Sequence, residues 1–378
     1  MSRSTGFRRP MLFTPAAHEP LVDEPWSADE VRTAIASIVA DAESAFDDGW
    51  PMHPRDVEKD DDPATRFRTL YLGGAGVVAA FHRLAERGFV DLRRDYVPYL
   101  ERSLEAPPDF PDDDAERSLW AGETGIRLVL QRLAPSRANL ERLSDLIAAN
   151  ERDERCELMF GSPGTILAGR ELGLDVTASI RWLQGQRDAD GLWTQHLFGR
   201  SSRCLGPAHG FAGCVLALGD DAADVSETLR PFAVEEDGLV NWLPYAGMTQ
   251  LDAHRDGQIR TQWCHGAPGI VATLAPFLDD ELAVAGGQLT WRAGPLRKGA
   301  NLCHGTAGNG YAFLALLEST GDERWLTRAR AFALHAARQV ELSRSEYGRG
   351  RYTLWTGDLG TALYLADCVD GGGQVPLP

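Results

Sequence analysis

Apolar residues recur along much of the chain at intervals of three and four, which is the period of an amphipathic helix. Residues 31–46 and 329–340 follow this pattern and predict helices with one buried face. Residues 270–277 and 310–317 are apolar nearly all round, which is typical of helices buried on every side. No alternation of apolar and polar residues persists over any length, so the pattern predicts an all-α fold.

A G-x-x-G tetrapeptide that leads into an apolar stretch occurs seven times, at intervals of 39 to 56 residues. Its glycines are Gly73 and Gly76, Gly122 and Gly125, Gly161 and Gly164, Gly210 and Gly213, Gly266 and Gly269, Gly305 and Gly308, and Gly357 and Gly360. This spacing suits helical hairpins, each with an amphipathic outer helix and a buried inner helix. Seven such hairpins close most simply into a ring, an α/α toroid. The alternative is an open solenoid with polar end repeats, whereas the last repeat ends in the apolar YLADCV.

The repeats cover about residues 65–370, so we predict a single toroid domain over residues 1–378. Glycine and proline make residues 1–30 and 371–378 loop-like in this prediction. Glycine at the amino end of each inner helix lets neighbouring backbones approach and leaves the first amides pointing into the central cavity. One end of the ring is therefore the expected place for a site.

Composition and charge exclude several classes of protein. A chain with 43% hydrophobic and 25% charged residues is ordinary for a folded protein. The formal charge of -17 and the lack of a basic run argue against nucleic acid and anionic membranes as partners. We expect a cytoplasmic protein, because the sequence shows neither the apolar segment of a secretory signal nor the ~18 apolar residues of a membrane span. The six scattered cysteines are expected to be thiols or metal ligands rather than disulfides.

Candidate chemistry is confined to three of the seven turns. Cys264 and His265 precede the fifth glycine pair, Cys303 and His304 precede the sixth, and His209 precedes the fourth. Two thiols and an imidazole form a standard ligand set for Zn²⁺. Because equivalent turns of neighbouring repeats lie side by side on a ring, we expect Cys264 and Cys303 to face each other, although 39 residues separate them.

The number of zinc ligands separates the interpretations. Three ligands and an open fourth position are typical of a catalytic zinc, and four ligands are typical of a structural one. A closed site that includes His265 therefore stays open, as does an interpretation in which the thiols are merely buried and the histidines cap helices. A zinc with an open position could lower the pKa of a bound thiol or activate water. Two thiolate ligands make the zinc less acidic, which favours sulfur alkylation over hydrolysis.

Four of the turns resemble a known family. WCHGAPG at 263–269 and LCHGTAGNGYAFL at 302–314 resemble the lanthionine synthetase C-like (LanC-like) family, nearest its free-standing glutathione-binding members. AHGFAG at 208–213 and ELMFGSPG at 157–164 fit the same family in the same order. The resemblance covers roughly residues 65–370, and the two cysteine-containing motifs are its most specific part.

The resemblance implies a seven-hairpin toroid with zinc in its cavity. Cyclases of this family add a cysteine thiol to dehydroalanine or dehydrobutyrine in a peptide, which gives lanthionine. Its glutathione-using members add glutathione to dehydroamino acids in damaged proteins. Carried over by position, Cys264, Cys303 and His304 would bind zinc. His209 would handle the enolate proton, and His265 would lie beside the metal without binding it.

The resemblance also implies roles for residues outside the Cys-His motifs. Glu157 stands where the peptide cyclases have aspartate, and the longer carboxylate is that of the glutathione-using branch; it could instead cap its turn or neutralise Arg155. Lys298, one of only two lysines, stands where that branch binds a glutathione carboxylate, although chance placement on a solvated loop is the alternative. Arg349 or Arg351 would match the family's arginine before the last turn, and the spacing does not select between them.

Three classes of function follow. The first is zinc-dependent addition of a thiol, from glutathione or a peptide cysteine, to a dehydroamino acid in a peptide or protein. The chain is too short to include a large dehydratase domain, so another protein would have to make the dehydroamino acid. The second is a non-catalytic zinc or glutathione sensor or scaffold, which needs no proton donor. The third is a glycosidase, which would need two carboxylates about 5–10 Å apart from among Glu123, Glu157 and Asp358 and would leave the Cys-His motifs unexplained.

Overall fold

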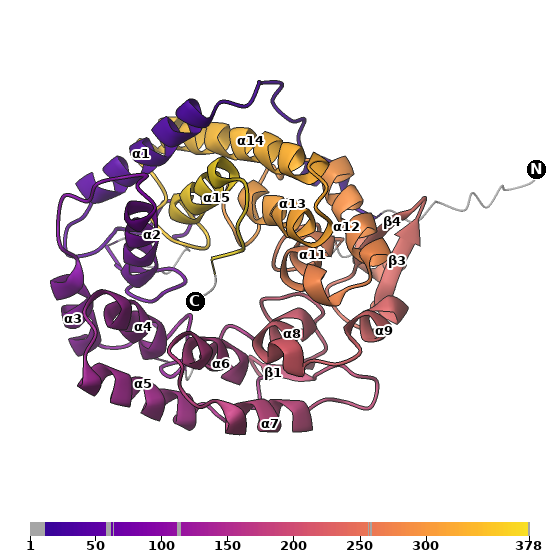
Figure 1. The fold of residues 1–378 in the computed structure, drawn as a ribbon, viewed down its shortest axis with the longest axis horizontal. Helices are drawn as coiled ribbons and strands as arrows, with labels where there is room; N and C mark the ends of the chain where they lie inside the picture. Colours follow the sequence, from indigo (N-terminus) through magenta and orange to yellow (C-terminus); the bar gives the residue numbers. More distant parts are fainter. Residues whose placement is uncertain are drawn as a thin grey trace, which may run out of the picture.

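Helices alternate between an outer and an inner ring around a common axis in the computed structural model, which describes residues 12–57, 62, 64–111, 115–255, 257 and 259–376 (Figure 1). The outer ring contains α1 (Ala28–Ser44), α3 (Val97–Glu105), α5 (Arg137–Ala149), α7 (Thr177–Gly185), α9 (Val225–Leu229), α12 (Asp280–Ala293) and α14 (Arg324–Tyr347). The inner ring contains α2 (Gly74–Glu86), α4 (Glu123–Leu133), α6 (Ser162–Glu171), α8 (Phe211–Leu218), α11 (Ala267–Leu274), α13 (Thr306–Thr320) and α15 (Asp358–Asp370). The predicted α/α toroid of seven hairpins is confirmed.

The two rings differ in burial as the apolar patterns predict. Outer helix α1 buries one face, which includes Val31, Ile35 and Ile38. Inner helix α15 is buried at every position from Asp358 to Cys368. The core therefore lies between and inside the rings, and the inner helices pack against neighbours on all sides.

The glycine motif has the same geometry in all seven repeats. The first glycine of each pair is the N-cap of an inner helix. The second glycine lies against a backbone carbonyl six residues earlier, so that a Cβ on Gly269 would lie 1.6 Å from the Trp263 oxygen and one on Gly308 1.7 Å from the Leu302 oxygen. No side chain fits there, which is why the motif needs glycine at this position.

Backbone hydrogen bonds between neighbouring turns close the ring. Cys264 N donates to Cys303 O, Cys303 N to Trp355 O, Trp355 N to Tyr71 O and Tyr71 N to Trp120 O, at 3.0, 2.9, 3.5 and 2.9 Å. Each of these residues lies two positions before the N-cap glycine of its repeat. The chain from Trp355 to Tyr71 joins the seventh repeat to the first, which excludes an open solenoid.

The ends of the chain depart slightly from the prediction. Residues 1–11 and 377–378 lie outside the described residues, and residues 371–376 contain no helix, as expected. Within the segment predicted as loop, a 3₁₀ helix, η1, covers Pro15–Ala17, and α1 already begins at Ala28. The early start has a local cause, because the Ser27 hydroxyl accepts a hydrogen bond from Glu30 N and caps the helix.

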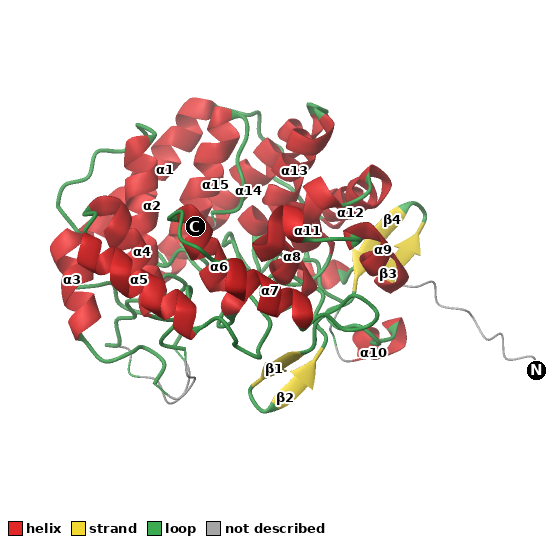
Figure 2. Cartoon of the chain, turned by 60° about the horizontal axis from the view of Figure 1, so that its bottom comes forward, coloured by secondary structure: helices red, strands yellow, loops and turns green. Residues whose placement is uncertain are grey.

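Two β-hairpins interrupt the helical repeats and were not predicted. β1 (Gln195–Leu197) pairs with β2 (Arg200–Ser202), and β3 (Ala233–Glu236) pairs with β4 (Leu239–Trp242), both antiparallel. Strands of three or four residues are too short to show alternation in the sequence. Figure 2 shows the β1–β2 hairpin projecting from one end of the ring, near the short helix α10 (Gln250–Arg255).

Two further expectations concern the membrane and the cysteines. Within the described ranges, no helix combines the length and the apolar character that crossing a bilayer requires. All six cysteines are buried and free, as expected for thiols or metal ligands.

Candidate functional site

The turns meet at one end of the ring, where six of the seven contribute to the lining of a cavity of about 500 Å³. Five of the seven residues that stand two positions before an N-cap glycine line it, namely Tyr71, Met159, Ala208, Cys264 and Cys303. Repeat position thus decides which side chains meet there, and the two cysteines occupy equivalent positions in neighbouring repeats. His209, His265 and Arg260 also line the cavity.

Cys264 and Cys303 lie side by side on the cavity wall and form a sulfur pair, as their repeat positions predict, with Cys264 N donating to Cys303 O at 3.0 Å. Tyr71 donates its hydroxyl hydrogen to Cys303 Sγ at 3.0 Å, and Gln262 donates from Nε2 to Cys264 Sγ at 2.9 Å. The His304 side chain lies near Cys303 and acts to lower the pKa of that thiol. Each sulfur therefore has a polar donor from a neighbouring side chain, although both sulfurs belong to buried residues.

These contacts set the order in which the two thiols ionise. The hydrogen bond with Cys264 lowers the pKa of Cys303, and His304 and Tyr71 act in the same direction against burial. The same interaction between the two thiols, together with burial, raises the pKa of Cys264. Burial and the neighbouring sulfur also raise the pKa of Tyr71 well above its usual 10.0, so this hydroxyl keeps its proton and acts as a donor. The pair is thus arranged to carry one negative charge, on Cys303.

The donor chemistry of this cluster fits Zn²⁺. Two adjacent thiols that readily share one negative charge, with an imidazole in contact, are the sulfur and nitrogen donors that zinc prefers. In the described part of the chain, however, no group of three or more His, Cys, Asp and Glu side chains is already gathered around one point. The structure thus brings Cys264 and Cys303 together, with His304 beside Cys303, but it does not gather the three around one point, and their role as ligands stays a prediction.

His209 is held by Glu157 across the turns of α8 and α6. His209 Nδ1 lies 2.8 Å from Glu157 Oε2, and the Glu157 side chain is fully buried. Burial acts to lower the pKa of His209, but the hydrogen bond and the charge of Glu157 outweigh it, so the pKa is raised above 6.5. The Phe160 ring stacks on the imidazole with centroids 6.3 Å apart. Because Nδ1 is occupied, Nε2 is the nitrogen that remains for a substrate.

Glu157 also caps its own turn. The sequence left a functional carboxylate and a turn cap as alternatives for this residue, and the structure shows the cap together with the contact to His209. Its carboxylate accepts hydrogen bonds from Met159 N, Phe160 N and Gly161 N at 2.9, 2.6 and 3.0 Å. Arg155 pairs with Asp153, through Nε at 2.8 Å. One carboxylate therefore shapes the turn and orients His209.

His265 lies in the cavity with its Nδ1 buried and without a partner among the described residues. Burial, with His209 and Arg260 nearby, lowers its pKa to about 3, so its imidazole is neutral at physiological pH. Its ring faces Tyr245, with centroids 6.3 Å apart. A neutral imidazole can exchange hydrogen bonds with a substrate but does not supply a proton as His209 can.

Lys298, Arg349 and Arg351 each contact one loop, at 52–56, and none of them lines the cavity. Arg55 Nη2 donates to the Lys298 carbonyl at 2.9 Å, and the Lys298 side chain is exposed. Arg349 donates to the Met52 carbonyl, and Arg351 forms a two-point ion pair with Asp56, with Nε at 2.7 Å. Arg351 therefore binds a substrate carboxylate only by sharing or releasing Asp56. The choice between the two arginines stays open.

Several cavity residues were not predicted. Tyr71 occupies the same repeat position as Cys303, so aligning the repeats by this position would have found it. Gln262 stands four positions before its N-cap glycine, as Glu157 does. Arg260 and Tyr245 lie outside the motifs and have no sequence signal; the Arg260 side chain has no ion pair within the described ranges.

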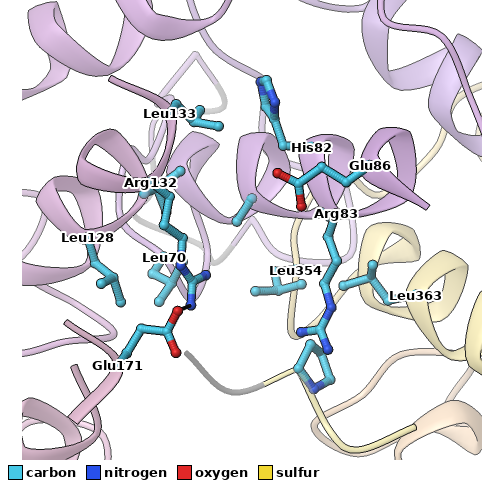
Figure 3. Close-up of a pocket in the computed structure, with 14 residues that line it drawn as sticks. Leu70, His82, Arg83, Glu86, Leu128, Arg132, Leu133, Glu171, Leu354 and Leu363 are labelled. Carbon is cyan, nitrogen blue, oxygen red and sulfur yellow. Dashed lines mark ion pairs between the residues drawn. The ribbon is translucent and has the colours of Figure 1, made fainter. Parts of the chain in front are cut away.

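A second cavity, of about 610 Å³, lies among the inner helices, and Figure 3 shows the residues that line it. It is lined by the carboxyl-terminal halves of α2 and α4 and by Leu70 and Leu354. Its charges are mixed, and Arg132 pairs with Glu171 at 2.8 Å. It contains none of the predicted site residues, so the candidate site is the cavity at the glycine turns.

Comparison with known proteins finds relatives and a matching fold. Over 121 residues the chain is 36% identical to the Glutathione S-transferase LANCL1 of Danio rerio, and over 185 residues it is 33% identical to the LanC-like protein GCL1 of Arabidopsis thaliana. These matches cover 28% and 44% of this chain, but only 27% and 41% of the relatives' own lengths. The solved structure of nisin cyclase matches 91% of this chain and 100% of its own, with a TM-score of 0.50 and 16% identity. At that identity the likeness concerns the fold alone.

The family model of the lanthionine synthetase C-like protein matches residues 67–376. This range contains all seven glycine turns and every predicted site residue. The chain therefore belongs to the lanthionine synthetase C-like family.

Proposed function

We propose that this protein catalyses the addition of a thiol to dehydroalanine or dehydrobutyrine in a peptide or protein, with Zn²⁺ as cofactor. The product is a thioether of the lanthionine type. The observation that carries the proposal is the placement of the sulfur pair, Cys264 and Cys303, in the same cavity as a histidine that Glu157 holds. Thiolate formation and proton delivery, the two requirements of this addition, are thereby served from one cavity.

Cys264, Cys303 and His304 would hold the metal, with Tyr71 and Gln262 as hydrogen-bond donors to the sulfurs. When bound, Zn²⁺ would supply a positive charge that keeps the incoming thiol deprotonated near neutral pH. The buried ring of turns around the cluster limits the access of water, which favours sulfur chemistry over hydrolysis.

The chain's other residues serve the carbon side of the addition. The thiolate sulfur bonds to the β-carbon of the dehydroamino acid, and the double-bond electrons move toward the α-carbon and its carbonyl oxygen. Protonated His209 then gives a proton to the α-carbon from Nε2, while Glu157 stabilises its charge at Nδ1. Arg260, a cation on the cavity wall, stabilises the negative charge that develops on the carbonyl oxygen.

Glutathione is the thiol that we favour, and a peptide cysteine is the alternative. The name of the Danio rerio relative, a glutathione S-transferase, supports glutathione. Lys298, Arg349 and Arg351, at the 52–56 loop, would bind its carboxylates, with Arg351 sharing or releasing Asp56. In this proposal the reaction takes place in the cytoplasm on a dehydroamino acid made by another protein.

The test is mass spectrometry of the metal-quantified protein after incubation with a dehydroalanine peptide and glutathione. We expect the peptide to gain one glutathione with the wild type. The Cys303→Ala and His209→Ala variants should each lose most of this activity, and chelation should abolish it. A protein with one zinc per chain and no adduct would favour a peptide cyclase or the non-catalytic sensor, and a protein without zinc would contradict the proposed site.

The competing functions explain less of the cavity. A sensor or scaffold gives no reason for a charged pair between His209 and Glu157. A glycosidase needs two opposed carboxylates, whereas Glu123 is paired with Arg127 and Arg142 and the Asp358 carboxylate binds Arg351 N. Neither accounts for the sulfur pair.

A further inference from the structure

A groove of about 830 Å³ runs between the β1–β2 hairpin and the segment at 244–246. His209, Tyr245 and His265 line both this groove and the cavity that contains the sulfur pair, so the two spaces are continuous. The cavity of about 500 Å³ is within the range of small-molecule sites and can hold the thiol without the groove. The groove therefore offers separate room for the second substrate.

One wall of the groove is a strand edge that is paired at Arg203 and Leu205 and free at Ser201. Arg203 O accepts from Ala246 N at 2.8 Å, and Leu205 N donates to Pro244 O at 3.1 Å. Backbone groups that face the same edge recur every second residue, so the N–H and C=O of Ser201 point to this edge as well. The neighbouring segment ends its pairing at Ala246, which leaves Ser201 without a strand opposite it in the described structure. An incoming strand would continue the line of 244–246.

The tip of the hairpin carries an aromatic residue in an unfavourable setting. Phe198 has a φ of +51°, a left-handed conformation that bulky residues rarely adopt, and its side chain is 72% exposed. Its ring lies edge-on to Phe160, which in turn stacks on His209. Backbone strain and exposure of an apolar ring both disfavour this arrangement in the free protein, and a ligand in the groove would cover the ring.

We propose that the groove binds an extended polypeptide segment of the dehydroamino acid substrate, whose backbone pairs with β2 at Ser201 and whose side chains contact Phe198. Pairing of this kind reads the peptide backbone rather than its sequence. It would therefore suit an enzyme that accepts dehydroamino acids in many sequence contexts. The inference rests on the proposed function for the identity of the peptide.

A pair of proline variants tests the edge. Ser201→Pro removes the N–H that faces the groove, and His196→Pro removes the N–H that faces the opposite edge of the same hairpin. Both variants lose the contact between His196 Nδ1 and Ser201 Oγ at 3.0 Å, and both leave the bonds between β1 and β2 in place. His196 does not line the groove, so it is a matched control.

The measurement is the anisotropy of a fluorescein-labelled ten-residue dehydroalanine peptide with the zinc-loaded protein in the absence of thiol. We expect the Kd to rise about tenfold with Ser201→Pro and to stay within twofold with His196→Pro. An unchanged Kd with Ser201→Pro, or an equal rise in both variants, would overturn the proposal.

N-methylated peptides supply a second test that leaves the protein unaltered. Because Ser201 supplies the one free carbonyl on this edge, strand pairing predicts that methylation weakens binding about tenfold at a single peptide position and has no effect at the residues on either side of it, whose N–H groups face away. Equal tolerance at all positions would overturn the proposal. Binding and turnover also separate the two hypotheses. A peptide that binds through Ser201 but gains no glutathione contradicts the reaction alone, whereas glutathione addition with binding insensitive to Ser201→Pro contradicts the groove alone.

Discussion

At the scale of single residues, the position four residues before the N-cap glycine caps the turn in several repeats, and in one repeat it also binds His209. The side chain four positions before the N-cap glycine accepts a hydrogen bond from the backbone three residues later at Ser118, at Glu157 and at Asn301. A hydroxyl, a carboxylate and an amide thus cap equivalent turns. Only Glu157 among these three also has a charged oxygen to spare, and that oxygen binds His209.

This comparison makes Glu157→Gln an informative variant. Asn301 shows that an amide can cap the turn, so the variant should fold, but the charge that raises the pKa of His209 is lost. We expect kcat/KM to begin to fall at a lower pH than in the wild type, and to be about tenfold lower than in the wild type at pH 8. The loss is of this size because general acid catalysis contributes about 10²–10⁴-fold. A pH–rate profile of thiol addition measures this, and an unshifted profile would exclude His209 as the proton donor.

The same pair makes a prediction for stability. The folded pKa of His209 lies above the unfolded value of 6.5, so the protonated imidazole contributes stability that is fully present below pH 6.5. That contribution disappears as the pH rises through the folded pKa. Chemical denaturation between pH 5.5 and 9 should show this decline in the wild type and a smaller one in His209→Gln. Parallel curves for the two proteins would contradict it.

Tyr71→Phe tests the hydrogen bond to the sulfur pair. The variant removes the donor to Cys303 Sγ and leaves the ring stacked beside Trp355. Loss of such a partner to a metal ligand typically costs about 10–100-fold in metal affinity, so we expect zinc binding at least about tenfold weaker in competition with a chromophoric chelator. Tyr245→Phe is the control, because Tyr245 faces His265 rather than a sulfur. Equal affinities in both variants would show that the Tyr71 hydroxyl does not act on the site.

At the scale of the element, each turn is built around a glycine that no other residue can replace. In Gly308→Ala the new Cβ would meet the Leu302 carbonyl at 1.7 Å, so the turn that carries Cys303 and His304 would have to move. We expect a loss of about 3 kcal/mol in the free energy of unfolding, at the upper end for overpacking. Gly185→Ala is the control, because that position is helical with open space around it and should gain about 0.5–1 kcal/mol. Urea titration of the two variants separates them.

The repeat also explains how much of the fold and the site could be predicted. Residues at fixed distances from the glycines, such as Cys264, Cys303 and His209, could be placed because every turn has the same geometry. Arg260 and the contacts of Arg351 with Asp56 could not, since they depend on segments between the motifs that differ from repeat to repeat. The three-residue strands of the β1–β2 hairpin are too short to leave an alternating pattern.

At the scale of the whole molecule, the junction between the first and seventh repeats decides whether the ring is a closed unit. There Leu354 packs on Gly76, and Trp355 N donates to Tyr71 O. On the other end of the inner helices, Arg87 after α2 pairs with Asp367 of α15 at 2.8 Å and with Asp370 at 2.9 Å. Because Cys303 and Tyr71 belong to opposite sides of this junction, the sulfur site depends on closure.

Arg87→Met tests the closure. The variant leaves the Asp367 carboxylate, whose side chain is only 6% exposed, with Tyr311 as its hydrogen-bond donor. We expect the free energy of unfolding to fall by about 2 kcal/mol. This is less than for a fully buried pair, because Arg87 is partly exposed. Arg324→Met, which removes an exposed pair with Asp322, should cost at most about 0.5 kcal/mol.

Burial raises the pKa of Asp367 in spite of Arg87, so a lower pH favours the folded state through this group. Without Arg87 the same carboxyl gains more from protonation, and the deficit of the variant should shrink as the pH falls from 8 to 5. A deficit independent of pH would show that the variant acts through packing alone, and two separate unfolding transitions would show that the ring does not fold as one unit.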